Sequence, residues 1–131
     1  MRADVIVWSG GEHAFRLALA QCEGLQQATD CGPDFLLAKF ESRMWTPKEA
    51  FEVLRWGLIG GGMEPAEAQK VVRGAFDRAA GYAEFKVTAL RVLLTSLYGP
   101  PDDPAGEGSP AGGTTQSGPE TDDGSSASTT A

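Results

Sequence analysis

The amino-acid composition changes abruptly near residue 99, and this change limits where a folded core can form. Residues 99–131 contain no Leu, Ile, Val, Phe, Trp, Lys or Arg and consist mostly of Gly, Pro, Ser, Thr, Ala and acidic residues. Such a segment cannot bury enough apolar surface to offset the entropy that is lost on ordering. We therefore predict one folded domain over residues 1–98 and a disordered acidic tail over residues 99–131.

The predicted tail also carries most of the net charge. The chain has a formal net charge of −7, and the tail holds six acidic residues and no basic one, so residues 1–98 carry only −1. A nucleic-acid surface needs clustered Lys and Arg, so this balance argues against nucleic acid as a partner. No stretch approaches the roughly 20 apolar residues of a membrane span or resembles a signal peptide, so we expect a cytoplasmic protein without a membrane partner.

A β-hairpin is predicted at the N-terminus from two runs of β-forming residues around a glycine pair. Residues 4–8 include Val, Ile, Val and Trp in succession, and residues 13–18 alternate in polarity. Gly10-Gly11 between them tolerates the backbone angles of a tight turn. Because an isolated hairpin is only marginally stable, we expect one face of it to pack against helices.

The rest of the domain is predicted to be helical, which gives a mainly α (α+β) fold with four to five helices in a small bundle. The weakest helix is the first, where Gly24 interrupts the apolar pattern. The segment Thr46-Pro47-Lys48-Glu49 contains an N-cap, a first-turn proline and the acid of a capping box. The predicted helices cover residues 20–29, 33–44, 47–59, 65–79 and 82–98.

The segment Gly57-Leu58-Ile59-Gly60-Gly61-Gly62-Met63 raises the question of phosphate binding. A P-loop follows a strand and ends in Lys and Ser or Thr, whereas here the preceding segment is helical and neither residue follows. Glu64 and Glu67 at the start of the next helix would also repel an anion. We therefore predict that the glycines end one helix and reverse the chain before the next.

No pattern of residues indicates catalysis, a metal site or a cofactor. His13 is the only histidine and has no ligand at metal-binding spacing. Cys22 and Cys31 stand nine residues apart, which is neither a metal nor a redox motif, and both are predicted to be free thiols. An enzyme remains an option only if a second chain completes an active site.

The last predicted helix contains more apolar residues than one buried face requires. Its single narrow polar stripe includes Arg91 and Thr95, and most of its other positions are apolar. Trp56 lies away from the apolar face of the helix predicted at residues 47–59. Surplus apolar surface and an exposed tryptophan are typical of protein interfaces. We predict a partner-binding surface that comprises Trp56, Phe76, Leu90, Leu93 and Leu97.

Four segments between residues 4 and 99 carry a resemblance to a known family: FRLAL (15–19), WTPKE (45–49), LIGGGMEPAEA (58–68) and LLTSLYG (93–99). They resemble the small protein family of the tail gene clusters of gene transfer agents and related prophages. This family is grouped with phage tail assembly chaperones and is sometimes labelled a tail tube protein. The chain departs from the family pattern at Glu64, where members usually have Ser or Thr, and in the tail after Tyr98.

The resemblance implies a non-enzymatic tail assembly chaperone without catalytic residues or cofactors. Such a protein binds the tape measure protein, with the tail tube protein as a further candidate partner. The main alternative is a structural tube or connector subunit, although such subunits usually contain more strand than the ten or so residues predicted here. The chaperone would act in the bacterial cytoplasm, and the structural subunit would stay in the particle. A homo-oligomer is compatible with both, and a regulatory binding module without a phage role is a generic fallback.

Overall fold

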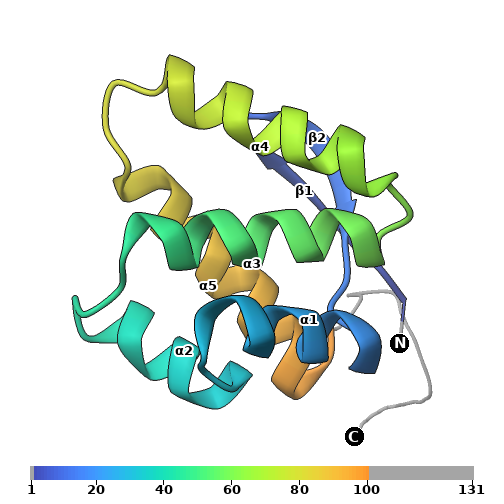
Figure 1. Ribbon diagram of the computed structural model, residues 1–131, viewed down its shortest axis with the longest axis vertical. Helices are drawn as coiled ribbons and strands as arrows, with labels where there is room; N and C mark the ends of the chain where they lie inside the picture. The colour runs from blue at the N-terminus through green and yellow to red at the C-terminus, as the bar shows by residue number, and fades with distance from the viewer. Residues whose placement is uncertain (1, 101–131) are drawn as a thin grey trace, which may run out of the picture. The chain divides into compact units, whose positions relative to one another are not determined.

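An N-terminal β-hairpin and five α-helices make up residues 2–100, the part of the chain that this computed structural model describes (Figure 1). This confirms the predicted mainly α fold. The predicted tail lies outside the described residues from position 101 onward, and the domain boundary at residue 98 stays a prediction. No helix within residues 2–100 is long and apolar enough to cross a membrane. The elements are β1 (Asp4–Trp8), β2 (Gly11–Phe15), α1 (Leu19–Thr29), α2 (Pro33–Glu41), α3 (Pro47–Gly60), α4 (Pro65–Arg78) and α5 (Ala83–Tyr98).

The hairpin is antiparallel, and its second strand begins two residues earlier than predicted. Trp8 pairs with Gly11, so the loop is only Ser9-Gly10, and Gly11 enters the strand with a φ of +124°. The strand ends at Phe15 because the next N–H group, that of Arg16, donates to the carbonyl oxygen of Gly57 in α3 at 2.9 Å. The predicted strand at residues 13–18 is therefore displaced to residues 11–15.

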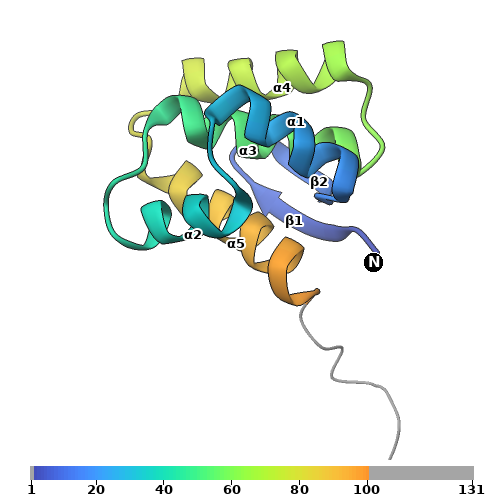
Figure 2. The same ribbon diagram turned by 60° about the horizontal axis from the view of Figure 1, so that its bottom comes forward.

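Helix α3 lies at the centre of the fold and contacts α1, α4, α5 and β2. Figures 1 and 2 show it between α4 and α5, with the hairpin beside α3 and α5. The inner face of the hairpin contributes Trp8, whose indole packs edge-on against Phe15 and against Phe85 of α5. The largest fully buried side chains come from the hairpin and all five helices: Phe15, Leu25, Leu36, Phe40, Val53, Leu54, Leu58, Val72, Phe85 and Leu93.

Two helix boundaries have a clear local cause: a capping box at the start of α3 and a backbone conformation after the end of α2. Helix α3 begins at Pro47 as predicted, since the Thr46 hydroxyl accepts from the Glu49 N–H and the Glu49 carboxylate accepts from the Thr46 N–H. Helix α2 ends at Glu41 instead of the predicted Met44. Arg43 has a φ of +65°, which breaks the helix in the manner usually provided by glycine.

Candidate interaction surface

The glycine-rich segment after α3 forms a close contact between α3 and β2. The helix ends at Gly60 and α4 begins at Pro65, which confirms that the glycines end one helix and precede the next. The backbones of Gly60 and Gly61 lie against the carbonyl oxygens of Arg16 and Ala14, and a Cβ atom at either position would overlap those oxygens. The carboxyl end of α3 therefore covers the outer edge of β2.

The outer edge of β1 is different, because no third strand pairs with it: the hairpin is a two-stranded sheet within the described residues. The closing pair of a two-residue hairpin, here Trp8 and Gly11, exchanges both hydrogen bonds, and bonded pairs then alternate along the strands. The N–H and C=O groups of Val5 and Val7 consequently point away from β2. Their side chains point away from the core as well and are 57% and 78% exposed. An open strand edge and two exposed valines thus coincide.

Helix α5, which contacts β1, also carries exposed apolar residues. Val87, Leu94 and Tyr98 are exposed and share one face of α5 with Arg91. From this face the Arg91 guanidinium reaches Asp4 of β1 and donates two hydrogen bonds of 2.8 Å to its carboxylate. We define the β1–α5 surface as Val5, Val7, Val87, Leu94 and Tyr98.

Two residues of the polar stripe predicted on the last helix, Arg91 and Thr95, bind Asp4 of β1. The Thr95 hydroxyl is buried and donates to the Asp4 carboxylate at 3.3 Å, next to the two bonds from Arg91. The bond to Asp4 raises the pKa of Arg91 above its usual value. Arg91 and Thr95 therefore hold β1 on α5. The apolar residues that are exposed on α5 differ from Leu90, Leu93 and Leu97, which were predicted from the sequence.

The five residues predicted to bind a partner are dispersed over three helices. Leu93 is 0% exposed, so its side chain can support a surface only from beneath. Leu90 and Leu97 are partly buried and pack against the core. The indole of Trp56 covers Gly24 of α1, and the Arg55 guanidinium lies 4.8 Å from its ring. Their role in partner binding stays a prediction.

Phe76, the remaining predicted residue, lies in an open groove between α3 and α4. Its ring stacks on Phe85 at a centroid distance of 4.1 Å and tilts against Phe51 at 5.4 Å. The groove has aromatic walls and charges of both signs, and it is lined by Pro47, Lys48, Phe51, Glu52, Gln69, Arg73, Phe76 and Asp77. Such a groove offers an apolar site of modest size and no cluster of catalytic groups.

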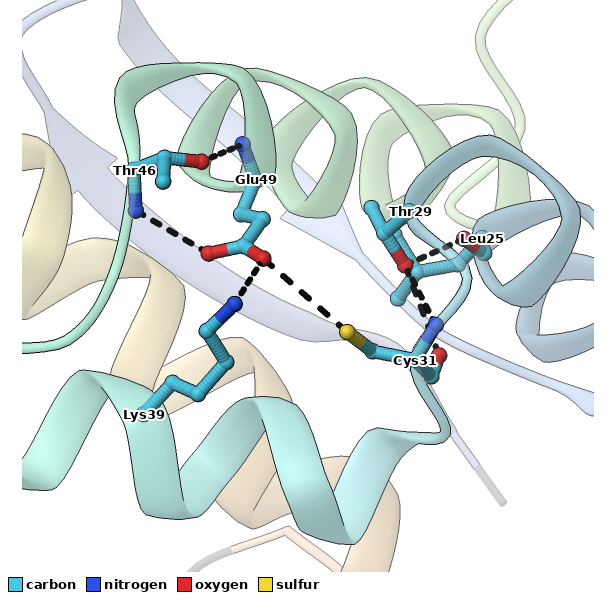
Figure 3. Close-up of polar contacts among 6 residues, drawn as sticks. All are labelled: Leu25, Thr29, Cys31, Lys39, Thr46 and Glu49. Carbon is cyan, nitrogen blue, oxygen red and sulfur yellow. Dashed lines mark hydrogen bonds and ion pairs between the residues drawn. The ribbon is translucent and has the colours of Figure 1, made fainter.

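A partly buried polar cluster joins α2, α3 and the end of α1 with the loop that follows it (Figure 3). The Glu49 carboxylate accepts hydrogen bonds from Lys39 Nζ at 2.5 Å and from the Thr46 N–H at 3.0 Å, and the Cys31 thiol lies 3.9 Å from it. The Thr29 hydroxyl donates to the Leu25 carbonyl at 2.8 Å and accepts from the Cys31 N–H at 3.3 Å. Every member is thus bonded to a neighbour, which makes the cluster a structural connection between helices.

The two cysteines and the single histidine form no joint site in the described residues. Cys22 and Cys31 are both free, as predicted. The Nδ1 atom of His13 accepts a hydrogen bond from the Trp8 indole at 2.9 Å. Within residues 2–100, no group of His, Cys, Asp and Glu side chains could hold a metal ion.

The ion pair between Lys39 and Glu49 should make the free energy of unfolding depend on pH in the alkaline range. The hydrogen bond from Lys39 to Glu49 raises the pKa of Lys39 above its usual value. A raised pKa in the folded state stabilises the protein below the unfolded value of about 10.4, and the stabilisation is lost as the pH rises through the folded value. We expect the free energy of unfolding of the natural chain to fall more steeply above about pH 10 than that of Lys39→Met. Urea unfolding over a pH series measures both slopes, and parallel curves would contradict the prediction.

Comparison with known families gave a match that covers the hairpin and the helices together. A family model described as phage tail tube protein, GTA-gp10, matches residues 3–99. The match includes the hairpin, all five helices of the described region and the glycine segment. Searches of curated proteins and of solved structures gave no match.

Proposed function

Since the chain belongs to the family described as phage tail tube protein, GTA-gp10, we propose that it is a structural component of the tail of a phage or gene transfer agent. The observation that carries this proposal is the match over residues 3–99, which covers nearly all of the described residues. The family description is that of a structural protein and not of an enzyme. The chain would therefore act by binding other tail proteins.

The β1–α5 surface supports a role in assembly. Its five apolar side chains are exposed although the same protein buries a complete core elsewhere. β1 and α5 are joined by the Asp4–Arg91 ion pair, and exposed apolar side chains on two adjoining elements offer a contact to another protein. A tail component needs such contacts with its neighbours, so we assign this surface to tail assembly.

A tail assembly chaperone that binds the tape measure protein is the second candidate function. The observation that favours it is the small amount of strand, two runs of five residues each, because tube subunits usually form their ring contacts from larger sheets. An amphipathic helix of a client could use the aromatic groove between α3 and α4. The family description names a tail tube protein, which favours the structural function over this one.

Purified particles distinguish the two functions. A structural component is expected in intact, nuclease-treated particles at a fixed ratio to the other tail proteins, measured by quantitative mass spectrometry. A chaperone would be required for tail formation and yet be absent from finished particles. A mock purification from a lysate that contains the protein but no assembled particles is the control for carry-over. Absence from particles that assemble only when the gene is present would overturn the structural proposal and favour the chaperone.

A further inference from the structure

The two edges of the hairpin differ in a way that indicates where this chain contacts its neighbour. The edge of β2 is covered, because the Arg16 N–H bonds to Gly57 and the backbones of Gly60 and Gly61 press on the strand. The edge of β1 pairs with no third strand within residues 2–100. Figure 2 shows β1 on the outer side of the hairpin, next to α5. One strand edge of the described domain is therefore available to another chain.

Several of the devices that protect an open edge are missing from β1. Its sequence Asp4-Val5-Ile6-Val7-Trp8 contains no Pro and no Lys, and it pairs with β2 residue by residue without a bulge. The charged residue Asp4 points inward and is neutralised by Arg91. An exposed edge with apolar side chains tends to pair with another strand, and native proteins generally block this when it is not wanted. We read the unprotected edge as a contact that the protein uses.

We propose that β1 pairs antiparallel with β1 of a second copy. The twofold axis that relates the two strands passes midway between the Ile6 residues of the two copies. Because α3 covers the β2 edge in every copy, the open β1 edge can meet only another β1 edge when two copies associate. Pairing about Ile6 places Val5 of one copy opposite Val7 of the other. These are the residues whose backbone groups point outward, so the hydrogen-bonding pattern of one edge fits that of the other.

Side chains and charge fit this arrangement. The two Val5 and two Val7 side chains would form one apolar cluster on the outer face of a continuous four-stranded sheet. Residues 1–98 carry a net charge of only −1, so the two domains repel each other weakly. Two paired strands alone bury less surface than a stable dimer needs, so the proposed contact also includes Val87, Leu94 and Tyr98, which are exposed on α5. A twofold contact of this kind is isologous, so the same patch serves both copies.

The inference deepens the proposed function, because it rests on the idea that a tail component associates with its own copies. It can nevertheless be tested without particles. The full chain should behave as a concentration-dependent dimer in analytical ultracentrifugation. Val7→Lys puts a charge on the edge at a side chain that is 78% exposed, so the fold should survive while the dimer dissociation constant rises about tenfold or more. Leu19→Lys, at a side chain that is 75% exposed on α1, is the matched control and should leave the constant unchanged.

Amide hydrogen exchange on the natural chain provides a test that requires no variant. The N–H groups of Val5 and Val7 point away from β2, so they should exchange quickly in dilute solution and slowly once the dimer forms. A chain that stays monomeric, a dimer that Val7→Lys does not weaken, or amides that become protected only when another tail protein is added would each overturn the proposal. A dimer in solution from a chain that is absent from particles would contradict the proposed function alone. A monomer that is nevertheless found in particles would contradict this inference alone.

Discussion

Replacement of Gly60 by Ala is expected to lower the free energy of unfolding by about 3 kcal/mol or more, or to prevent folding. A Cβ atom at this position would overlap the carbonyl oxygen of Arg16, which belongs to the backbone and cannot rotate away as a side chain can. Helix α3 and β2 would have to separate, although the Arg16 N–H bond to Gly57 holds them together. Gly61→Ala should behave similarly, because its Cβ atom would overlap the carbonyl oxygen of Ala14.

Gly81→Ala is the matched control for this prediction. Gly81 lies between α4 and α5, and a Cβ atom there would have no neighbour within 4 Å. The same chemical change should therefore alter stability by less than about 1 kcal/mol, in either direction. Urea unfolding followed by circular dichroism measures all three variants. Equal midpoints for Gly60→Ala and Gly81→Ala would show that α3 and β2 are not in close contact.

The glycine prediction also concerns the proposed assembly. The contact at Gly60 and Gly61 covers the edge of β2 and so leaves β1 as the open edge. If β2 also became open, β1 of one copy could pair with β2 of the next. That contact is heterologous and need not close, so aggregation would follow. A Gly60→Ala protein that folds at all should accordingly form larger particles than dimers in light scattering.

Local sequence signals were sufficient for much of the fold. The strand at residues 4–8 followed from consecutive β-forming residues, and the start of α3 at Pro47 followed from its capping box. The predicted end of α2 was wrong because Arg43 has a positive φ angle, which the residue type arginine does not predict. The second strand was misplaced because its end depends on the contact of Arg16 with α3, which is distant in sequence.

The candidate surface was less predictable than the fold, since it depends on how elements pack. Gly24 was read as weakening α1, whereas it provides the space in which the Trp56 indole rests. Leu93 is fully buried although its helix has surplus apolar residues. The exposed valines of β1 did leave a signal that sequence reasoning missed. A strand that is apolar at successive positions, as at Val5, Ile6 and Val7, presents apolar side chains on both faces.

Loss of the Asp4 carboxylate is the second large effect that we expect. Asp4→Ala should lower the free energy of unfolding by about 2–3 kcal/mol, because the carboxylate accepts bonds from Arg91 and Thr95 that join the first strand to the last helix. The Thr95 hydroxyl is buried and would lose this partner, whereas Arg91 is half-exposed and could be solvated by water. Most of the cost should therefore come from the buried side of the contact.

Two further variants separate the contributions. Arg91→Gln leaves the buried Asp4 carboxylate without its countercharge and with Thr95 as a remaining partner, so it should cost at least as much as Asp4→Ala. Thr95→Val in the Asp4→Ala background removes the unpartnered hydroxyl and should restore part of the stability. The same series should weaken the dimer, because Asp4 and Arg91 hold β1 at the angle to α5 on which the β1–α5 surface depends. If Asp4→Ala lost stability but dimerised as tightly as the natural chain, the position of β1 on α5 would not control the contact between copies.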